Sequence, residues 1–200
     1  VPVAERQRAL GARGITVSTL KEAEQFHAAG FDDILYAVGI APAKLAQARA
    51  LRERGCGLTL LVDSLAAAQA VVASRHRFPV LIEIDTDDHR AGVKPDEPRL
   101  LDIARVLHEG AELRGVMTHC GASYDCRGAA ALEAIAEQER ARCVRAAERL
   151  REAGLPCPVV NLAQDIDPRD FVMAQNKARR HVTKAQLAIA TTAVYQWKPH

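Results

Sequence analysis

The chain has 200 residues, a formal net charge of +2 and five cysteines, with 48% hydrophobic and 26% charged residues. These values are typical of one soluble globular domain, and the small net charge gives no support for a nucleic-acid-binding or membrane-surface protein. No apolar run reaches the roughly 18 residues of a membrane-spanning helix, and no secretory signal opens the chain. The cysteines form no CxxC pair or disulfide-dense pattern, so we expect a cytoplasmic protein.

Short apolar runs alternate with amphipathic stretches along most of the chain. Prolines near helix starts and glycines just past helix ends, such as Pro42 and Gly55, indicate the helix boundaries. This alternation predicts right-handed βαβ crossovers and a parallel sheet. After the end of a helix over 4–13, the expected strands are 15–19, 33–38, 57–62, 79–85, 114–119 and 158–162, and the expected helices are 20–29, 42–54, 64–75, 97–109 and 130–153.

Two architectures can be built from six strand–helix units. An open nucleotide-binding sheet lacks its usual sequence support, because no GxGxxG motif opens a helix after a strand and no GxxxxGK[ST] motif is present. An eight-stranded barrel has the same alternation but typically takes about 250 residues. We therefore expect an α/β fold, an incomplete (β/α)8 TIM-type barrel with about six βα units. Its exposed parallel edges predict either low stability or association into homodimers.

Polar and ionisable residues follow two neighbouring apolar runs, where parallel strands carry their chemistry. The run 80–84 leads into a loop that contains Arg90. The run 113–117 leads to His119 and, five residues later, to Tyr124. These two strand ends are the candidate functional site.

Four stretches carry a family resemblance: GARGITVSTLKEAEQFHAAGFDDILYAVGIAPAKL, LIEIDTDDHRAGVKP, LRGVMTHCGASYDC and ERLREAGLPCPVV. They lie within residues 3–160 and resemble the D-serine dehydratase and D-threonine aldolase-like group. These are fold type III pyridoxal-phosphate enzymes built on the alanine-racemase N-terminal-type barrel. The resemblance implies strands two to seven of that barrel, pyridoxal 5'-phosphate as cofactor, and a lyase acting on small D-amino acids by elimination or aldol cleavage.

The resemblance also implies roles for single residues. Arg90, in the pattern DTxxxRxG, resembles the arginine that hydrogen-bonds the phenolic oxygen of the cofactor and tunes its ring. His119 resembles the histidine that lies against the pyridine ring, and Tyr124 resembles an active-site tyrosine near cofactor or substrate. Asp85 and Thr86 are expected to orient the turn that presents the arginine.

The chain also departs from the family pattern. In the family the Schiff-base lysine lies at the end of the first strand, before the matched segment, and none of Lys21, Lys44 and Lys94 resembles it. The chain begins Val-Pro-Val, and Asn-Leu-Ala-Gln replaces the phosphate loop expected after residue 160. The resemblance thus predicts a D-amino-acid lyase truncated at both ends. The missing lysine argues against catalysis by this chain alone and leaves a non-catalytic truncated or fused fragment as the alternative.

The last part of the chain differs in character. We divide the chain into a partial cofactor-binding barrel, 1–164, and a divergent helical basic tail, 165–200, with a helix expected over 171–195. The stretch NKARRHVTKAQ within it weakly resembles a helical motif of ParB-like partition and nuclease-type proteins. A tail-mediated DNA-binding module is therefore a further alternative, although such basic faces are most often solvated and we do not expect a nucleic-acid partner.

The sequence does not predict a metal site. Cys120 and Cys126 have His119 beside them, but structural zinc ligands are usually closer in sequence. On a strand His119 and Cys120 point to opposite faces, which also argues against a cysteine–histidine nucleophile pair. The acidic cluster 85–88 is more economically explained as part of a loop than as a magnesium site.

Overall fold

A computed structural model describes residues 1–88 and 91–160. These ranges contain six strands, β1 (Ile15–Val17), β2 (Asp33–Gly39), β3 (Gly57–Val62), β4 (Pro79–Ile84), β5 (Glu112–Thr118) and β6 (Val159–Val160). All neighbouring pairs are parallel and the strand order follows the chain, from β1 to β6. A doubly wound sheet would reverse its strand order, so this order is that of a barrel. The expected incomplete barrel is confirmed.

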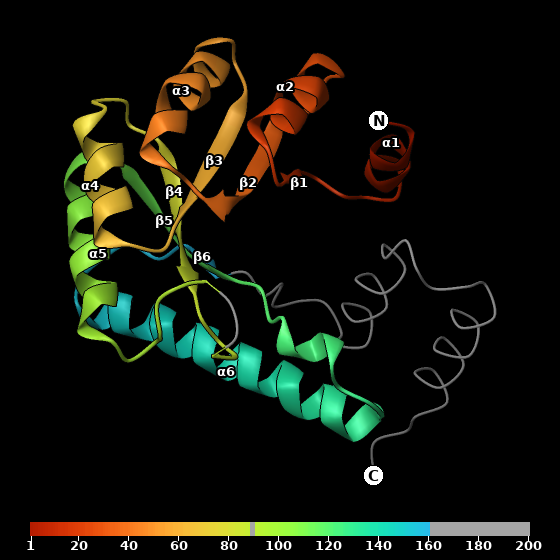
Figure 1. The fold of residues 1–200 in the computed structure, drawn as a ribbon, viewed down its shortest axis with the longest axis vertical. Coiled ribbons are helices and arrows are strands. Elements are labelled where there is room, and N and C mark those ends of the chain that lie inside the picture. The colour runs from red at the N-terminus through yellow and green to blue at the C-terminus, as the bar shows by residue number, and fades with distance from the viewer. Residues whose placement is uncertain (89–90, 161–200) are drawn as a thin grey trace. The chain divides into compact units, whose positions relative to one another are not determined.

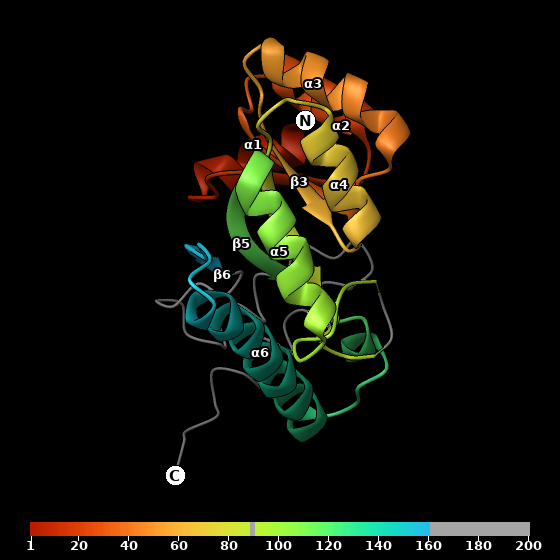
Figure 2. The same cartoon turned by 90° about the vertical axis from the view of Figure 1, so that its left-hand side faces the viewer.

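The helices of the described ranges, apart from the first, each follow a strand and pack on one face of the curled sheet (Figures 1 and 2). They are α1 (Pro2–Ala9), α2 (Leu20–Ala28), α3 (Leu45–Glu53), α4 (Leu65–Ala73), α5 (Pro98–Gly110) and α6 (Ala129–Glu152), with 3-10 turns η1 (Pro42–Lys44) and η2 (Ala122–Tyr124). In the described ranges no helix is both long and apolar enough to cross a membrane.

Side-chain caps set two of the helix starts. Thr19 accepts the backbone N–H of Glu22 while the Glu22 carboxylate accepts the Thr19 N–H, which is a complete capping box. This cap explains why β1 ends at Val17 and not at the expected residue 19. At the start of α4, the Ser64 side chain accepts the backbone N–H of Ala67.

The remaining expected elements are found with shifts of a few residues at their ends. The expected helix 42–54 begins as η1 and becomes α3 only at Leu45. The last expected strand is seen over Val159–Val160, and its residues 161 and 162 lie outside the described ranges. The expected tail helix and its basic cluster also lie outside them. The domain boundary after residue 164, the homodimer, the cytoplasmic location and the absence of a nucleic-acid partner stay predictions.

The two faces of the sheet differ in chemistry. On the helix side, residues such as Ile34, Leu60 and Ile82 are fully buried and form the apolar core. Because successive strand residues point to opposite faces, Thr59 and Glu83 belong to the other face, the one that a barrel encloses. Both are polar and nearly buried. The interior face of the sheet is therefore the one that carries buried polar side chains.

Candidate functional site

The loop after β4 is fixed by the carboxylate of Asp85. Its Oδ1 accepts the backbone N–H of Asp88 at 2.8 Å and that of Asp87 at 3.3 Å. The loop then returns to its own strand, because the Asp85 N–H donates to Val93 O and the Val93 N–H donates to Glu83 O. A short polar side chain that closes a turn in this way is typical of aspartate. The expected turn-orienting role of Asp85 is therefore seen in the structure, whereas Arg90 lies outside the described residues.

The return of this loop requires a glycine. Gly92 has φ +125°, and a Cβ there would lie 2.5 Å from Asp85 N and 2.7 Å from the carbonyl carbon of Ile84. Only a residue without a side chain fits against the strand backbone at that distance. The close approach allows the bridge between Ile84 and Val93.

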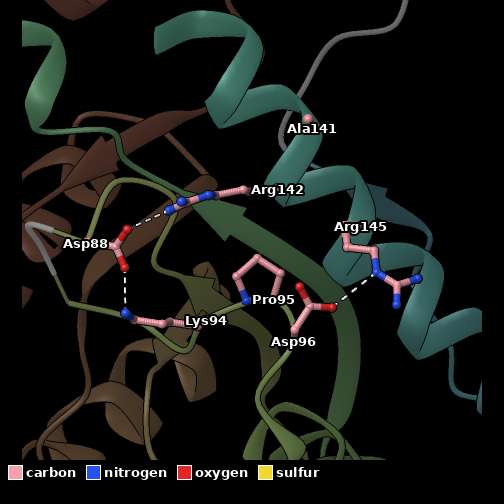
Figure 3. A pocket seen from close by; sticks show the side chains of 7 residues that line it. All are labelled: Asp88, Lys94, Pro95, Asp96, Ala141, Arg142 and Arg145. Atoms are coloured by element: carbon pink, nitrogen blue, oxygen red, sulfur yellow. Dashed lines mark hydrogen bonds and ion pairs between the residues drawn. The ribbon is translucent and has the colours of Figure 1, made fainter.

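Asp88 is held by two cations. Its backbone has φ +61°, an uncommon conformation for a residue other than glycine. Lys94 Nζ lies 2.5 Å from Asp88 Oδ1, and Arg142 Nη1, from α6, lies 2.9 Å from Oδ2 (Figure 3). The hydrogen bonds from Lys94 and then Arg142 lower the pKa of Asp88, and Asp88 in turn raises the pKa of Lys94. Lys94 is therefore held in its charged form.

A pocket of about 430 Å³ lies between this loop and α6 (Figure 3). Its charged residues are largely paired with one another, since Arg145 contacts Asp96 at 3.2 Å in addition to the Asp88 pairs. An incoming ligand would have to break these pairs, so we assign the pocket no ligand. It is lined by Asp88, Lys94, Pro95, Asp96, Ala141, Arg142 and Arg145.

The ends of β4 and β5 are joined by two buried threonines. The Thr118 hydroxyl donates to Ile84 O at 2.9 Å and lies 2.7 Å from Thr86 Oγ1. Because the Thr118 proton is used on that carbonyl, the Thr86 hydroxyl is the donor between the two side chains. The carbonyl of Thr86 also accepts Gln138 Nε2 and Arg142 Nη1 from α6, at 2.8 and 3.0 Å. Strand ends and helix are thus fixed together.

The loop after β5 is held through its backbone amides. The Cys120 N–H donates to Glu139 Oε1 at 3.2 Å, and the Ala122 N–H donates to Asp87 Oδ2 at 2.7 Å. The Ser123 hydroxyl closes the turn by donating to Cys120 O. The loop therefore takes its position from both α6 and the loop after β4.

His119 and Tyr124 lie side by side at the ends of this loop. Tyr124 Oη is 3.3 Å from His119 Nε2, and the ring centroids are 6.0 Å apart with the ring planes inclined by 48°. Both residues are exposed. The structure thus brings together two of the three residues that the sequence suggested for a cofactor site.

The described lysines all have acceptors of their own. Lys21 pairs with Glu24 on the surface of α2, and Lys44 Nζ donates to the Tyr36 hydroxyl at 2.9 Å. Tyr36 is fully buried on the helix side of β2, away from the barrel interior. The exposed rings of His119 and Tyr124 are chemically suited to contact a pyridoxal-type ring, but an amine placed to bind its aldehyde is not found among the described lysines.

Metal and thiolate chemistry find no support in the described ranges. They contain no group of three His, Cys, Asp or Glu side chains placed to hold a metal ion. Burial, followed by the charges of Glu139 and Asp87, raises the pKa of Cys120 to about 11. Its thiol is therefore protonated near neutral pH, unlike a reactive cysteine.

Sequence reasoning missed the contribution of α6. Gln138, Glu139 and Arg142 reach back to loops 19 to 56 residues earlier in the chain. In the sequence they look like any polar residues of a charged helix. Arg142 lies four residues after Gln138 and three after Glu139, and these spacings, which make side chains neighbours on a helix, are the only signal that could have suggested a shared role.

Glu139 gives a pH-dependent stability prediction. Burial is the largest cause that raises its pKa in the folded chain, and the charge of Asp87 adds to it. The folded chain then binds the proton more tightly than the unfolded chain, so this group's contribution to stability is lost as pH rises through the raised pKa. We expect Glu139→Gln to be more stable than the unmutated chain at neutral pH, with the gain shrinking as pH falls toward 4. Urea unfolding at several pH values measures this, and a gain independent of pH would contradict it.

A parallel sheet of barrel order, with a polar site at two adjacent strand ends, defines a TIM-type barrel domain of the kind that carries cofactor or catalytic chemistry. The family model for the alanine racemase N-terminal domain matches residues 1–164. The chain belongs to this family, and the predicted relation to fold type III pyridoxal-phosphate enzymes is confirmed.

Individual relatives agree with this assignment. The chain is 62% identical over 168 residues to D-threo-3-hydroxyaspartate dehydratase of Delftia sp. (strain HT23), covering 81% of this chain and 44% of that protein. The solved structure of that dehydratase superposes with a TM-score of 0.79 over 80% of this chain and 44% of the dehydratase chain. D-threonine aldolase of Arthrobacter sp. is 31% identical over 79% of this chain and 43% of the aldolase. The chain thus spans less than half the length of these relatives.

A more distant structure shows the fold alone. Alanine racemase of Clostridium difficile 630 is 19% identical and has a TM-score of 0.64, covering 79% of this chain and 42% of the racemase. The partial barrel is therefore shared well beyond the dehydratases and aldolases.

Proposed function

We propose that this chain provides part of the cofactor-binding barrel of a pyridoxal-phosphate-dependent dehydratase acting on D-3-hydroxy amino acids. The observation that carries the proposal is the 62% identity to the Delftia D-threo-3-hydroxyaspartate dehydratase. The D-threonine aldolase relative, at 31% identity, supports a D-amino-acid substrate but makes aldol cleavage the less favoured reaction.

We assign cofactor contacts to Arg90, His119 and Tyr124. When bound, pyridoxal phosphate supplies an electron sink for the electron pair that remains on the substrate's Cα when a bond to that carbon breaks. His119 offers a ring face that is exposed and oriented by its contact with Tyr124. In the sequence Arg90 lies between Asp85 and Gly92, which fix the described parts of the loop after β4, and this supports a role for the loop as carrier of a cofactor contact.

The proposal is tested by titrating the purified chain with pyridoxal phosphate. Absorbance is recorded before and after borohydride reduction, and the labelled lysine is located by peptide mass. A saturable absorbance band fixed to one lysine supports the proposal, because it identifies an amine that serves the site. Absence of saturable binding, or labelling spread over the surface lysines, contradicts it and favours a non-catalytic fragment.

A variant pair sharpens the test. His119→Ala removes the aromatic face and is expected to weaken cofactor binding about tenfold, the loss of one ring contact. His108→Ala is the matched control, because His108 is an exposed histidine in the last turn of α5. Equal affinities for the two variants would remove His119 from the site.

A further inference from the structure

We infer that Glu139 and Asp87 are positioning residues that hold the loop between His119 and Tyr124 in place. The inference rests on the proposed function in one respect, that the loop carries residues which contact the cofactor. That the two carboxylates hold the loop in place depends only on contacts within this chain. Neither carboxylate needs to touch the cofactor for the role.

The two carboxylates reach the loop from different elements. Glu139 reaches from α6 to the Cys120 N–H at 3.2 Å, and Asp87 reaches from the loop after β4 to the Ala122 N–H at 2.7 Å. These amides are two residues apart, and the loop they fix has His119 at one end and Tyr124 at the other. Because the anchors are backbone amides, the carboxylates control the path of the chain itself. The spacing of the two rings depends on that path.

The arrangement is costly to keep. Asp87 is nearly buried, Glu139 is partly buried, and the charge of Asp87 opposes ionisation of Glu139. Asp87 and the Cys120 thiol are the titratable groups that face Glu139 from the packed loops, and Arg142, one turn further along α6, contacts Asp88. A neutral side chain at position 139 would avoid the desolvation cost. Retaining a carboxylate at this position is the pattern expected of a group that serves a site at the expense of stability.

An ionised acceptor gives a stronger bond to the Cys120 amide than a neutral one. Hydrogen bonds to a carboxylate are shorter and roughly twice as strong as those between neutral groups. Gln at position 139 keeps an oxygen acceptor of the same shape without the charge, and therefore imitates protonated Glu139. Leu at that position removes the acceptor altogether. Comparison of the two variants therefore separates the effect of the hydrogen bond to the Cys120 amide from the effect of side-chain packing at position 139.

The test uses the Cys120 and Ala122 amide resonances in ¹⁵N-correlated NMR spectra of the full chain. In the unmutated chain the Cys120 resonance is expected to move upfield as pH falls and Glu139 takes up its proton, reaching the position seen in Glu139→Gln. In Glu139→Gln it stays fixed with pH. A Cys120 resonance that ignores pH in the unmutated chain, or equal Cys120 positions in Glu139→Gln and Glu139→Leu, overturns the inference.

Cofactor affinity supplies the second readout. Glu139→Leu leaves the Cys120 amide without its acceptor and is expected to weaken pyridoxal-phosphate binding about tenfold, whereas Glu139→Gln weakens it about twofold. Glu137→Gln is the matched control, since Glu137 is exposed on the same helix and pairs with Arg140; unchanged affinity is expected. If the unmutated chain binds no cofactor, the proposed function fails while the amide resonances still decide the positioning role.

Discussion

Gly92→Ala is expected to destabilise the chain by about 3 kcal/mol, from a strained backbone and a clash with a neighbouring strand. At φ +125° an added Cβ would lie 2.5 Å from Asp85 N and 2.7 Å from the carbonyl carbon of Ile84. Both atoms belong to the backbone at the end of β4 and cannot rotate away as a side chain would. The loop must then leave the strand, which breaks the two backbone hydrogen bonds made by Val93. Urea unfolding measures the loss.

Gly154→Ala is the matched control for this prediction. Gly154 also has a positive φ, +72°, but nothing lies within 4 Å of its added Cβ. Its alanine variant therefore carries the backbone cost alone, about 1 kcal/mol. Equal losses for the two variants would show that the close approach at Gly92 contributes nothing to stability.

The sequence predicted the sheet well because buried parallel strands leave a strong local signal. The run 78–84 is apolar except for one glutamate, and it is flanked by the charged residues Arg77 and Asp85. The strand end could be predicted for the same reason, and Asp85 does close the turn. What the pattern did not contain was the partner of each polar group. Asp87 is one of three similar aspartates in the sequence, yet its carboxylate holds the Ala122 amide 35 residues away.

The contribution of α6 shows the limit of local patterns most clearly. A helix rich in Ala, Glu and Arg reads as a solvated helix, and several of its ion pairs, such as Glu137 with Arg140, are of that kind. Glu139 is two residues further on, about 200° further round the helix axis and so on nearly the opposite face from Glu137, where it meets the loop after β5. Residue type alone does not distinguish Glu137 from Glu139. The two differ in burial, which follows from the packing of α6 beside β5 and is therefore seen only in the folded chain.

Thr118→Val is expected to cost about 2 kcal/mol, because it leaves two buried partners unsatisfied. The Thr118 hydroxyl donates to Ile84 O and accepts from the Thr86 hydroxyl, and Thr86 and Thr118 are 1% and 5% exposed. Valine keeps the shape of the side chain, so the loss reports the hydroxyl and not a cavity. Thr86→Val should cost less, since Thr118 still bonds to Ile84 O in that variant.

The double variant tests whether the two hydroxyls act as a pair. With Thr86→Val and Thr118→Val combined, no Thr86 donor remains to be stranded, so the total loss should fall short of the sum of the single losses by about 1 kcal/mol. Urea unfolding of the four chains completes the cycle. Additive losses would show that the 2.7 Å contact does not couple β4 to β5. Coupling would show that this hydrogen bond joins the two strand ends at the base of the loops that carry the candidate site.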